Sequence, residues 1–112
     1  MNCLFCKIVN KELPADIVYE DGKTMAFSDI NPKAKIHILI IPKVHTESII
    51  SDGSEKIVGD LIKTAKKVAL DKKMQGYKLM FNVGKIGGQM IDHIHLHLLS
   101  AEKGMEELLG EV

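Results

Sequence analysis

Three histidines stand at alternate positions late in the chain, at His93, His95 and His97, and the residues between them are apolar. Strict alternation is the period of a β-strand, so the three imidazoles are expected on one face. A neutral imidazole is a nucleophile near pH 7 that can attack phosphorus, and neighbouring rings can donate hydrogen bonds to phosphate oxygens. Stacked histidines without a chemical role are costly, because each ring needs a partner and protonated rings repel one another. The spacing therefore predicts a site for phosphorus chemistry.

A catalytic metal site is an alternative for the same histidines, since ligands from neighbouring strand positions can bind zinc. Metal-bound histidines usually donate their second N–H to a carboxylate or a carbonyl group. The only nearby carboxylate is that of Asp92, which the alternation places on the opposite face of the strand. The sequence therefore favours a nucleophilic histidine over a catalytic metal.

Cys3 and Cys6 are the only cysteines, and they form a Cys-x-x-Cys motif. This spacing is too short for a disulfide framework, and in a reducing compartment it indicates metal or redox chemistry first. The motif alone leaves three roles open: ligands of a structural zinc, two ordinary reduced cysteines, or a redox-active pair.

The composition excludes several classes of protein. The chain has 112 residues, 46% of them hydrophobic, and its 15 basic and 15 acidic residues give a formal charge of zero. This size fits one domain, and the neutral charge leaves no footprint for nucleic acid or for an anionic membrane surface. No apolar run approaches a membrane span and no signal-peptide pattern opens the chain, so a cytoplasmic location is expected. A small domain near zero net charge associates readily, which favours a homodimer.

The elements that must position the histidines follow from periodicity. Residues 3–9 suit a short helix, and residues 16–20 and 24–28 read as two antiparallel strands joined by a tight turn. Residues 35–41 form the most β-branched run and predict a central strand, in which His37 is the only polar interior residue.

A long amphipathic helix follows from Ser51, with Ser51 or Ser54 as its N-cap and Gly76 near the position that ends it. Residues 77–83 resume strand composition, and a glycine-rich loop then leads into the histidine strand. Residues 101–112 are expected to be a loose or dimer-contacting tail. Hairpins and one long helix, without alternating β-α-β units, predict an α+β fold with a mostly antiparallel sheet of about five strands.

Residues 93–99 match His-φ-His-φ-His-φ-φ at every position, where φ is apolar, and this pattern resembles the signature of the histidine triad (HIT) family. The resemblance covers nearly the whole chain and implies a single HIT domain over residues 1–112. It looks most like the Hint branch, whose members are nucleoside phosphoramidate hydrolases and adenylyl hydrolases that work as homodimers. The further segments that carry it are Phe5-Cys6-Lys7-Ile8, Tyr19-Glu20-Asp21, Ala26-Phe27-Ser28-Asp29-Ile30, Ile40-Ile41-Pro42-Lys43-Val44-His45 and Gly87-Gly88-Gln89.

The resemblance implies a role for each catalytic histidine. His95 would be the nucleophile that becomes nucleotidylated, His97 and His37 would contact phosphate oxygens, and His93 would support them from behind. The substrate would be AMP or GMP joined to an amine, acyl or phosphate group, and no metal would be required for catalysis.

Nucleotide binding is also implied by the resemblance. Asp29 would accept hydrogen bonds from the ribose, Asn82 would contact phosphate or ribose, and the backbone amides of Gly88, Gln89 and Met90 would serve as oxyanion donors. The slot for the purine would be formed by Leu4, Phe5, Ile8, Leu13, Phe27 and Ile30. Without the resemblance, Asp29 and Asn82 read as turn residues and the apolar side chains read as core.

Met90 departs from the family pattern, because Hint proteins usually carry a serine there that helps to protonate the leaving group. A thioether cannot donate a proton. This substitution keeps open the alternative of a nucleotide-binding or scaffold protein with little turnover. Asp92 replaces a usual aromatic residue, and Ser100-Ala101-Glu102 replaces a typical Gly-Gly-Arg.

The resemblance also bears on the cysteines. Several prokaryotic members of the family combine a Cys-x-x-Cys motif with two histidines to bind a structural zinc. The matching positions here are Cys3, Cys6, His45 and His93. Such a zinc would hold the N-terminal turn against the sheet.

Overall fold

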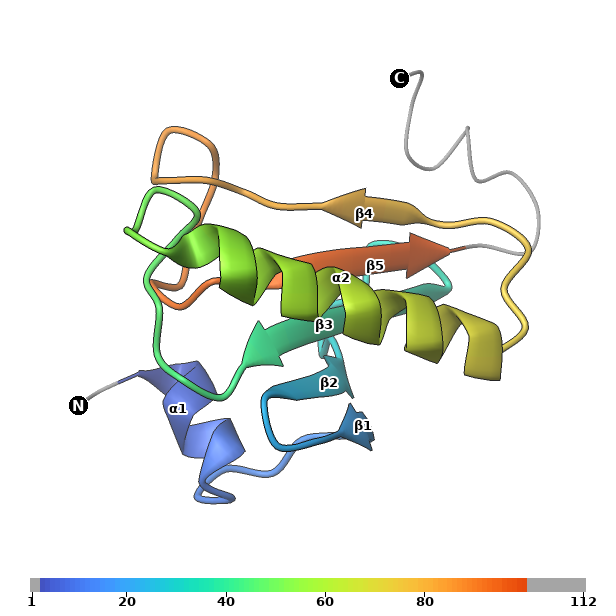
Figure 1. Cartoon of the computed structure of the whole chain (residues 1–112). Helices are drawn as coiled ribbons and strands as arrows, with labels where there is room; N and C mark the ends of the chain where they lie inside the picture. Colours follow the sequence, from blue (N-terminus) through green and yellow to red (C-terminus); the bar gives the residue numbers. More distant parts are fainter. Residues whose placement is uncertain (1–2, 101–112) are drawn as a thin grey trace.

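The computed structural model describes residues 3–100, which form one sheet and two helices (Figure 1). The elements in chain order are α1 (Leu4–Val9), β1 (Ile17–Glu20), β2 (Thr24–Ser28), β3 (Ile36–Pro42), α2 (Ser54–Asp71), β4 (Lys78–Met80) and β5 (Leu96–Ser100). The tail predicted at residues 101–112 lies outside the described residues. Neither described helix is long and apolar enough to cross a membrane.

The sheet has the strand order β1-β2-β3-β5-β4, and all neighbouring strands are antiparallel. β3 is the central strand, as its β-branched sequence predicts. The turn between β1 and β2 is closed by Asp21, whose Oδ1 accepts hydrogen bonds from the backbone N–H groups of Lys23 and Thr24. The predicted α+β fold, with five antiparallel strands, one long helix and a short N-terminal helix, is confirmed.

One face of the sheet is covered by α2 (Figure 1). The apolar stripe of α2 packs there against the residues that alternate with the histidines. The buried members of this cluster are Ala26, Ile38, Ile40, Leu61, Ala65, Val68, Ile94, Leu96 and Leu98.

The opposite face carries α1 and the histidines. Cys3 is the N-cap of α1, its Sγ accepting the backbone N–H of Cys6 at 3.4 Å, and Asn10 is the C-cap. A second buried cluster joins α1 to the sheet through Cys3, Phe5, Ile8, Met25, Phe27, Leu39 and Ile41. The functional residues therefore lie on the face that α2 leaves free.

The predicted N-cap of α2 is wrong. The N-cap is Gly53, with φ 77°, and neither serine side chain caps the helix. The hydroxyl of Ser54 instead donates to the carbonyl of Ile49 at 2.6 Å, and the hydroxyl of Ser51 accepts the N–H of Ser48. Both hydroxyls are thus used by the turn that precedes the helix.

The predicted helix end at Gly76 is also wrong. α2 ends at Asp71, and the residue with the left-handed conformation is Lys73, with φ 57°. The N–H of Met74 then bonds to the carbonyl of Ala69 at 2.9 Å, which satisfies one of the last free carbonyls of the helix.

Both later strands are shorter than predicted. β5 begins only at Leu96, so His93 and His95 precede it. The reason is that the carbonyl of His93 accepts a hydrogen bond from the His95 ring at 2.8 Å, and the N–H of Ile94 bonds to the carbonyl of Thr46 at 2.7 Å. Backbone groups that would pair with a strand are therefore taken by a side chain and a loop.

Candidate active site

A cleft of ≈ 780 Å³ opens on the histidine face of the sheet. α1 and the segment after it form one wall, and the loop around residues 29–33 and the glycine-rich loop complete the rim. Its predicted lining residues are Leu4, Phe5, Ile8, Leu13, Phe27, Asp29, Ile30, His37, Asn82, Gly88, Met90, His95 and His97. The structure therefore brings together nearly all the residues expected to bind a nucleotide.

His37 and His97 form a directed pair at the floor of this cleft. The backbone N–H of Lys33 donates to His37 Nδ1 at 3.0 Å, so the proton of the neutral ring lies on Nε2. His37 Nε2 in turn lies 2.9 Å from His97 Nδ1, which must accept. The proton of His97 is thereby placed on Nε2, a buried atom without a hydrogen-bond partner among residues 3–100. The cleft-lining residue His97 thus has a buried N–H donor that no described residue uses.

His95 has the opposite orientation. Its Nδ1 lies 2.8 Å from the carbonyl oxygen of His93, which can only accept, so Nδ1 carries the proton. The lone pair of the neutral ring is therefore on Nε2. The His95 and His97 rings have centroids 5.0 Å apart, and the Phe5 and His95 rings pack edge to face with centroids 5.2 Å apart. A ring with a nucleophilic nitrogen and a ring with a hydrogen-bond donor therefore lie side by side.

Burial keeps the floor histidines neutral. Burial, together with the neighbouring rings of His95 and His37, lowers the pKa of His97 to about 4. Burial also lowers the pKa of His37, although the carboxylate of Asp29 partly offsets this. At neutral pH both rings can therefore keep the proton arrangement that their partners impose.

The position of Asp29 suits both roles considered for it, the turn contact and the contact with a ribose. Its Oδ1 accepts the backbone N–H of Asn31 at 2.8 Å, which is the expected turn contact. Its Oδ2 lies 3.5 Å from His37 Nε2 and faces the cleft. Asn82 lines the cleft as well, and its Nδ2 donates to the carbonyl of Gly87 at 2.9 Å.

The glycine-rich loop offers fewer donors than predicted. The amide of Gly88 bonds to the carbonyl of Lys85 at 3.0 Å, and that of Gln89 bonds to the carbonyl of Gly84 at 2.9 Å. Two of the three proposed oxyanion donors are thus used within the loop. Of the three, only the amide of Met90 has no partner among the described residues.

Gln89 is buried and does not line the cleft, contrary to its predicted role as a nucleotide contact. Its Oε1 accepts the N–H of Gly84 at 3.0 Å, while its Nε2 donates to the carbonyls of Glu47 at 2.6 Å and Ile91 at 2.9 Å. Gln89 therefore joins the glycine-rich loop to two other segments. Its position in the sequence, between flexible glycines and a strand, carries no signal for these distant acceptors.

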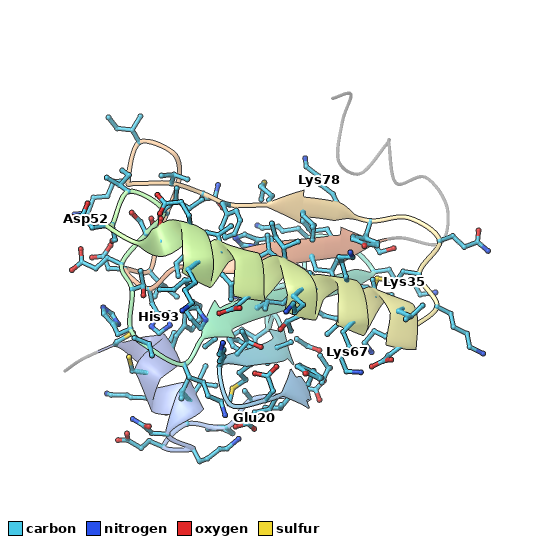
Figure 2. All side chains as sticks on the ribbon, in the orientation of Figure 1. Glu20, Lys35, Asp52, Lys67, Lys78 and His93 are labelled. Carbon is cyan, nitrogen blue, oxygen red and sulfur yellow. The ribbon has the colours of Figure 1, made fainter. Side chains whose placement is uncertain are left out.

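A second cluster lies beside the first turn of α1. Cys3 Sγ and Cys6 Sγ lie 3.3 and 3.6 Å from His93 Nδ1, and Cys6 Sγ lies 3.3 Å from His45 Nδ1. The four ligand atoms all lie within 4.8 Å of one another. His93 Nε2 faces the carbonyl of Pro42 at 2.9 Å, so its lone pair is on Nδ1, toward the cysteines. His93 is labelled in Figure 2, where it lies between α1 and the end of β3.

These four residues fit a tetrahedral zinc. Zn–S bonds of ~2.3 Å and Zn–N bonds of ~2.0–2.1 Å imply S···N distances of about 3.6 Å. The observed S···N distances of 3.3 to 3.6 Å are close to this value. Without metal, burial raises the pKa of the Cys6 thiol, and the adjacent Cys3 raises it further.

The three histidines of the motif do not converge on one point, which contradicts the alternative of a catalytic metal held by all three. His93 presents Nδ1 to the cysteines, whereas His95 and His97 line the cleft. The two groups of potential ligands in the described chain contain His93 and His97 separately, and neither contains His95.

The model of the HIT domain matches residues 10–104 of this chain. The chain belongs to the HIT family. A HIT family hydrolase from Legionella pneumophila is 47% identical, with a TM-score of 0.82 over 88% of this chain and 92% of the other.

Two further HIT structures differ in what their names report. A histidine triad nucleotide-binding protein from Candida albicans is 35% identical, with a TM-score of 0.80 over 87% of this chain and 73% of the other. A Zn-bound histidine triad family protein from Mycobacterium smegmatis is 32% identical, with a TM-score of 0.84 over 95% of this chain and 79% of the other.

The HIT cleft also contains residues that sequence reasoning did not find. Lys33, Lys78 and Met80 line it, and Figure 2 shows Lys78 on the edge strand β4. Met80 pairs with His97 in the sheet, so period-2 alternation places Lys78 on the same face. That alternation was a usable signal, but it required knowing that β4 lies beside β5.

Proposed function

We propose that this HIT protein hydrolyses purine nucleoside phosphoramidates or adenylates through a nucleotidyl-histidine intermediate on His95. The observation that carries the proposal is that one cleft is lined by two complementary histidines. His95 has its lone pair on Nε2, and His97 has an N–H without a partner among the described residues. A phosphate group placed between them meets a nucleophile and a hydrogen-bond donor at once. The hydrolase from Legionella pneumophila supports the general activity.

The nucleoside would occupy the α1 side of the cleft. Phe5 and Phe27 pack edge to face, with ring centroids 5.6 Å apart, and Leu4 and Ile30 are exposed beside them. Such an apolar slot suits a flat purine base. Asp29, which lines the same cleft, would accept hydrogen bonds from the ribose hydroxyls through Oδ2. The nucleotide-binding relative from Candida albicans supports this part of the proposal.

The chemistry proceeds in two displacements. His95 Nε2 forms a bond to phosphorus while the bond to the leaving group breaks, and the leaving group departs with that electron pair. The carbonyl of His93 accepts the Nδ1–H of His95 and so stabilises the positive charge that develops on the ring. His97 Nε2–H stabilises the negative charge on the phosphate oxygens. Water then attacks phosphorus, the N–P bond breaks, and the free nucleoside monophosphate is released.

Met90 restricts the leaving group. Met90 is 90% exposed and lines the cleft, where a hydroxyl in place of its thioether would supply a proton to a departing amine. Adenylates, whose acidic leaving groups depart without a proton, are therefore favoured over phosphoramidates. The same observation supports the second candidate, a nucleotide-binding or scaffold protein with little turnover.

The second cluster is proposed to bind a structural zinc through Cys3, Cys6, His45 and His93. The support is the fit of the S···N distances to a tetrahedron, together with the Zn-bound relative from Mycobacterium smegmatis. A bound zinc would supply a crosslink between α1 and the segment that precedes β5. No step of the reaction requires it, because His95 and His97 belong to the other cluster.

A homodimer in the cytoplasm is proposed as the working form. The formal charge of zero imposes no net repulsion between copies. β4 is an edge of the described sheet, and the backbone of an edge strand can pair with a second copy. Sedimentation velocity at micromolar concentration tests this, and a monomer mass at all concentrations would reject it.

The decisive experiment is intact-protein mass spectrometry after brief incubation with adenosine 5′-phosphoramidate or an aminoacyl adenylate. We expect one added AMP that disappears with time, and no adduct in His95→Ala. Calorimetry of AMP binding to His95→Ala checks that the variant still folds and keeps its pocket. If AMP binds but neither substrate produces an adduct or free AMP, the nucleotide-binding candidate replaces the enzyme.

A further inference from the structure

The two cysteines lie one turn apart on the same side of α1, as close neighbours. Cys3 caps the helix with its Sγ accepting the N–H of Cys6, and both sulfurs approach the same nitrogen, His93 Nδ1. They are the only cysteines of the chain, and both thiols are free in this structure. No step of the proposed reaction uses them.

We propose that Cys3 and Cys6 form a redox modification site, at which a low-molecular-weight disulfide converts the two thiols into a Cys3–Cys6 disulfide and thereby weakens nucleotide binding. The inference rests on the proposed function in two respects: that proposal makes a nucleotide the ligand of the cleft, and it places a zinc at the cysteines. Disulfide formation itself depends on neither.

The oxidation is a balanced thiol–disulfide exchange. One cysteine sulfur attacks a sulfur of oxidised glutathione, forming a mixed disulfide and expelling one glutathione thiolate. The second cysteine sulfur then attacks the first cysteine, forming the internal disulfide and expelling the second glutathione. The protein is oxidised by two electrons, and one oxidised glutathione is reduced to two thiols, which take up the protons or leave as thiolates.

The disulfide and the cluster with the histidines exclude one another. A disulfide requires the sulfurs to be ~2.05 Å apart, whereas two zinc-bound thiolates are separated by about 3.8 Å. Neither sulfur of a disulfide is a thiolate that can bind a metal. A disulfide also has no S–H group to donate to the lone pair of His93 Nδ1, which lies 3.3 Å from Cys3 Sγ. Oxidation therefore removes the hydrogen bond to His93 and the zinc that would join α1 to both histidines.

That loss reaches the nucleotide site because the same short helix forms its wall. α1 places Leu4, Phe5 and Ile8 in the cleft, between the two cysteines and just after them. The Phe5 ring also packs edge-on against His93 at 5.8 Å and His95 at 5.2 Å. A helix of six residues is not stable by itself, so its position depends on such tertiary contacts. Loosening it removes one side of the proposed purine slot.

The test uses the full chain, loaded with zinc and treated with oxidised glutathione. We expect a mass loss of two hydrogens, a Cys3–Cys6 link in the peptide map, and release of zinc to a chromogenic chelator. The Kd for AMP, measured by calorimetry, should rise at least tenfold on oxidation and recover with dithiothreitol. By linkage, saturating AMP should then raise the midpoint potential of the pair by ~30 mV for each tenfold change in affinity, because AMP binds the reduced form more tightly.

The double variant C3S/C6S is the matched control, because it keeps the size of both side chains but has no thiol. Its AMP affinity should not respond to oxidised glutathione. A response of this variant, a stable mixed disulfide on one cysteine without the internal disulfide, or an unchanged Kd for AMP after complete oxidation would each overturn the inference.

If the reduced protein does not bind AMP at all, it is the proposed function that fails. Amide hydrogen exchange in residues 4–9 then decides the inference. Faster exchange after oxidation supports it, and unchanged protection rejects it.

Discussion

His37 and His97 are joined by a direct imidazole–imidazole hydrogen bond of 2.9 Å, although they lie on neighbouring strands sixty positions apart. The bond requires one donor and one acceptor, so both rings cannot be protonated without losing it. The backbone N–H of Lys33 sets the direction of the bond, and its consequence is the free N–H of His97 in the cleft. A backbone N–H in the segment that precedes β3 thus determines which group His97 presents from β5.

The stability of the protein should fall in mild acid. The pKa of His97 is about 4 in the folded chain, against an ordinary value of 6.5. Between these values the unfolded chain binds a proton that the folded chain does not. The contribution of His97 to the free energy of unfolding is therefore fully present above pH 6.5 and is lost as the pH falls from 6.5 toward 4. Urea unfolding at pH 7, 5.5 and 4.5 measures this. The variant His97→Asn should show a shallower pH dependence, and an equal slope would refute the assignment to His97.

Two substitutions of His97 distinguish the roles of its two ring nitrogens. In His97→Gln the side-chain amide can replace Nε2–H as a donor to the phosphate, whereas in His97→Asn the side-chain oxygen can replace only Nδ1 as the acceptor from His37. We expect the glutamine variant to keep more of kcat, and the asparagine variant to lose 10²–10³-fold, as when an oxyanion donor is removed. Single-turnover hydrolysis of an aminoacyl adenylate provides the comparison. Equal losses would show that the free N–H is not used.

Met90→Ser should improve the cleavage of phosphoramidates selectively. A hydroxyl at this exposed position can pass a proton to a departing amine, and proton transfer of this kind typically contributes 10²–10⁴-fold. We expect kcat for an adenosine phosphoramidate to rise at least tenfold while kcat for an adenylate changes little. Met90→Ala controls for the loss of bulk at the rim. If alanine produces the same rise, the effect is steric.

Gln89→Ala should destabilise the fold more than it weakens nucleotide binding. The substitution leaves the N–H of Gly84 and the carbonyls of Glu47 and Ile91 without their partner. Each of the three lost hydrogen bonds contributes ~0.5–1.5 kcal/mol, so a loss of at least ~1.5 kcal/mol is expected in urea unfolding. A variant of normal stability but greatly reduced AMP affinity would instead show that the side chain of Gln89 contacts the nucleotide.

The fold was predictable where its signals are local. The Asp21-Gly22 turn, the β-branched run of β3 and the apolar stripe of α2 each act within a few residues, and the structure confirms all three elements. The ends of α2 were not predictable in this way. The hydroxyls of Ser51 and Ser54 satisfy backbone groups of the preceding turn, and a cap can be chosen only once that turn is known.

The site, like the fold, was predictable only where its signals are local. The spacing of the histidines was enough to predict a cluster on one face, yet it could not show that His93 faces the cysteines while His95 and His97 face the cleft. That division depends on the carbonyls of Pro42 and His93, which fix the proton on each ring. The contribution of Lys78 depends on the pairing of β4 with β5, a contact between segments about twenty residues apart.

Gly87 should be the least replaceable glycine of the loop beside the cleft. A Cβ added there would lie 2.3 Å from the carbonyl oxygen of Val83, a backbone atom that cannot move without reshaping the loop. Gly87→Ala should therefore displace the loop, and with it Gly88 and the free amide of Met90, lowering kcat/KM at least tenfold for any substrate. The matched control is Gly59→Ala, since a Cβ at this position meets nothing within 4 Å and the residue lies inside α2.

In a helix interior, alanine is more stable than glycine by ~0.5–1 kcal/mol, so the control should raise the Tm by a few degrees without a change in activity. Full activity of Gly87→Ala would mean that the loop tolerates the shift and does not shape the site.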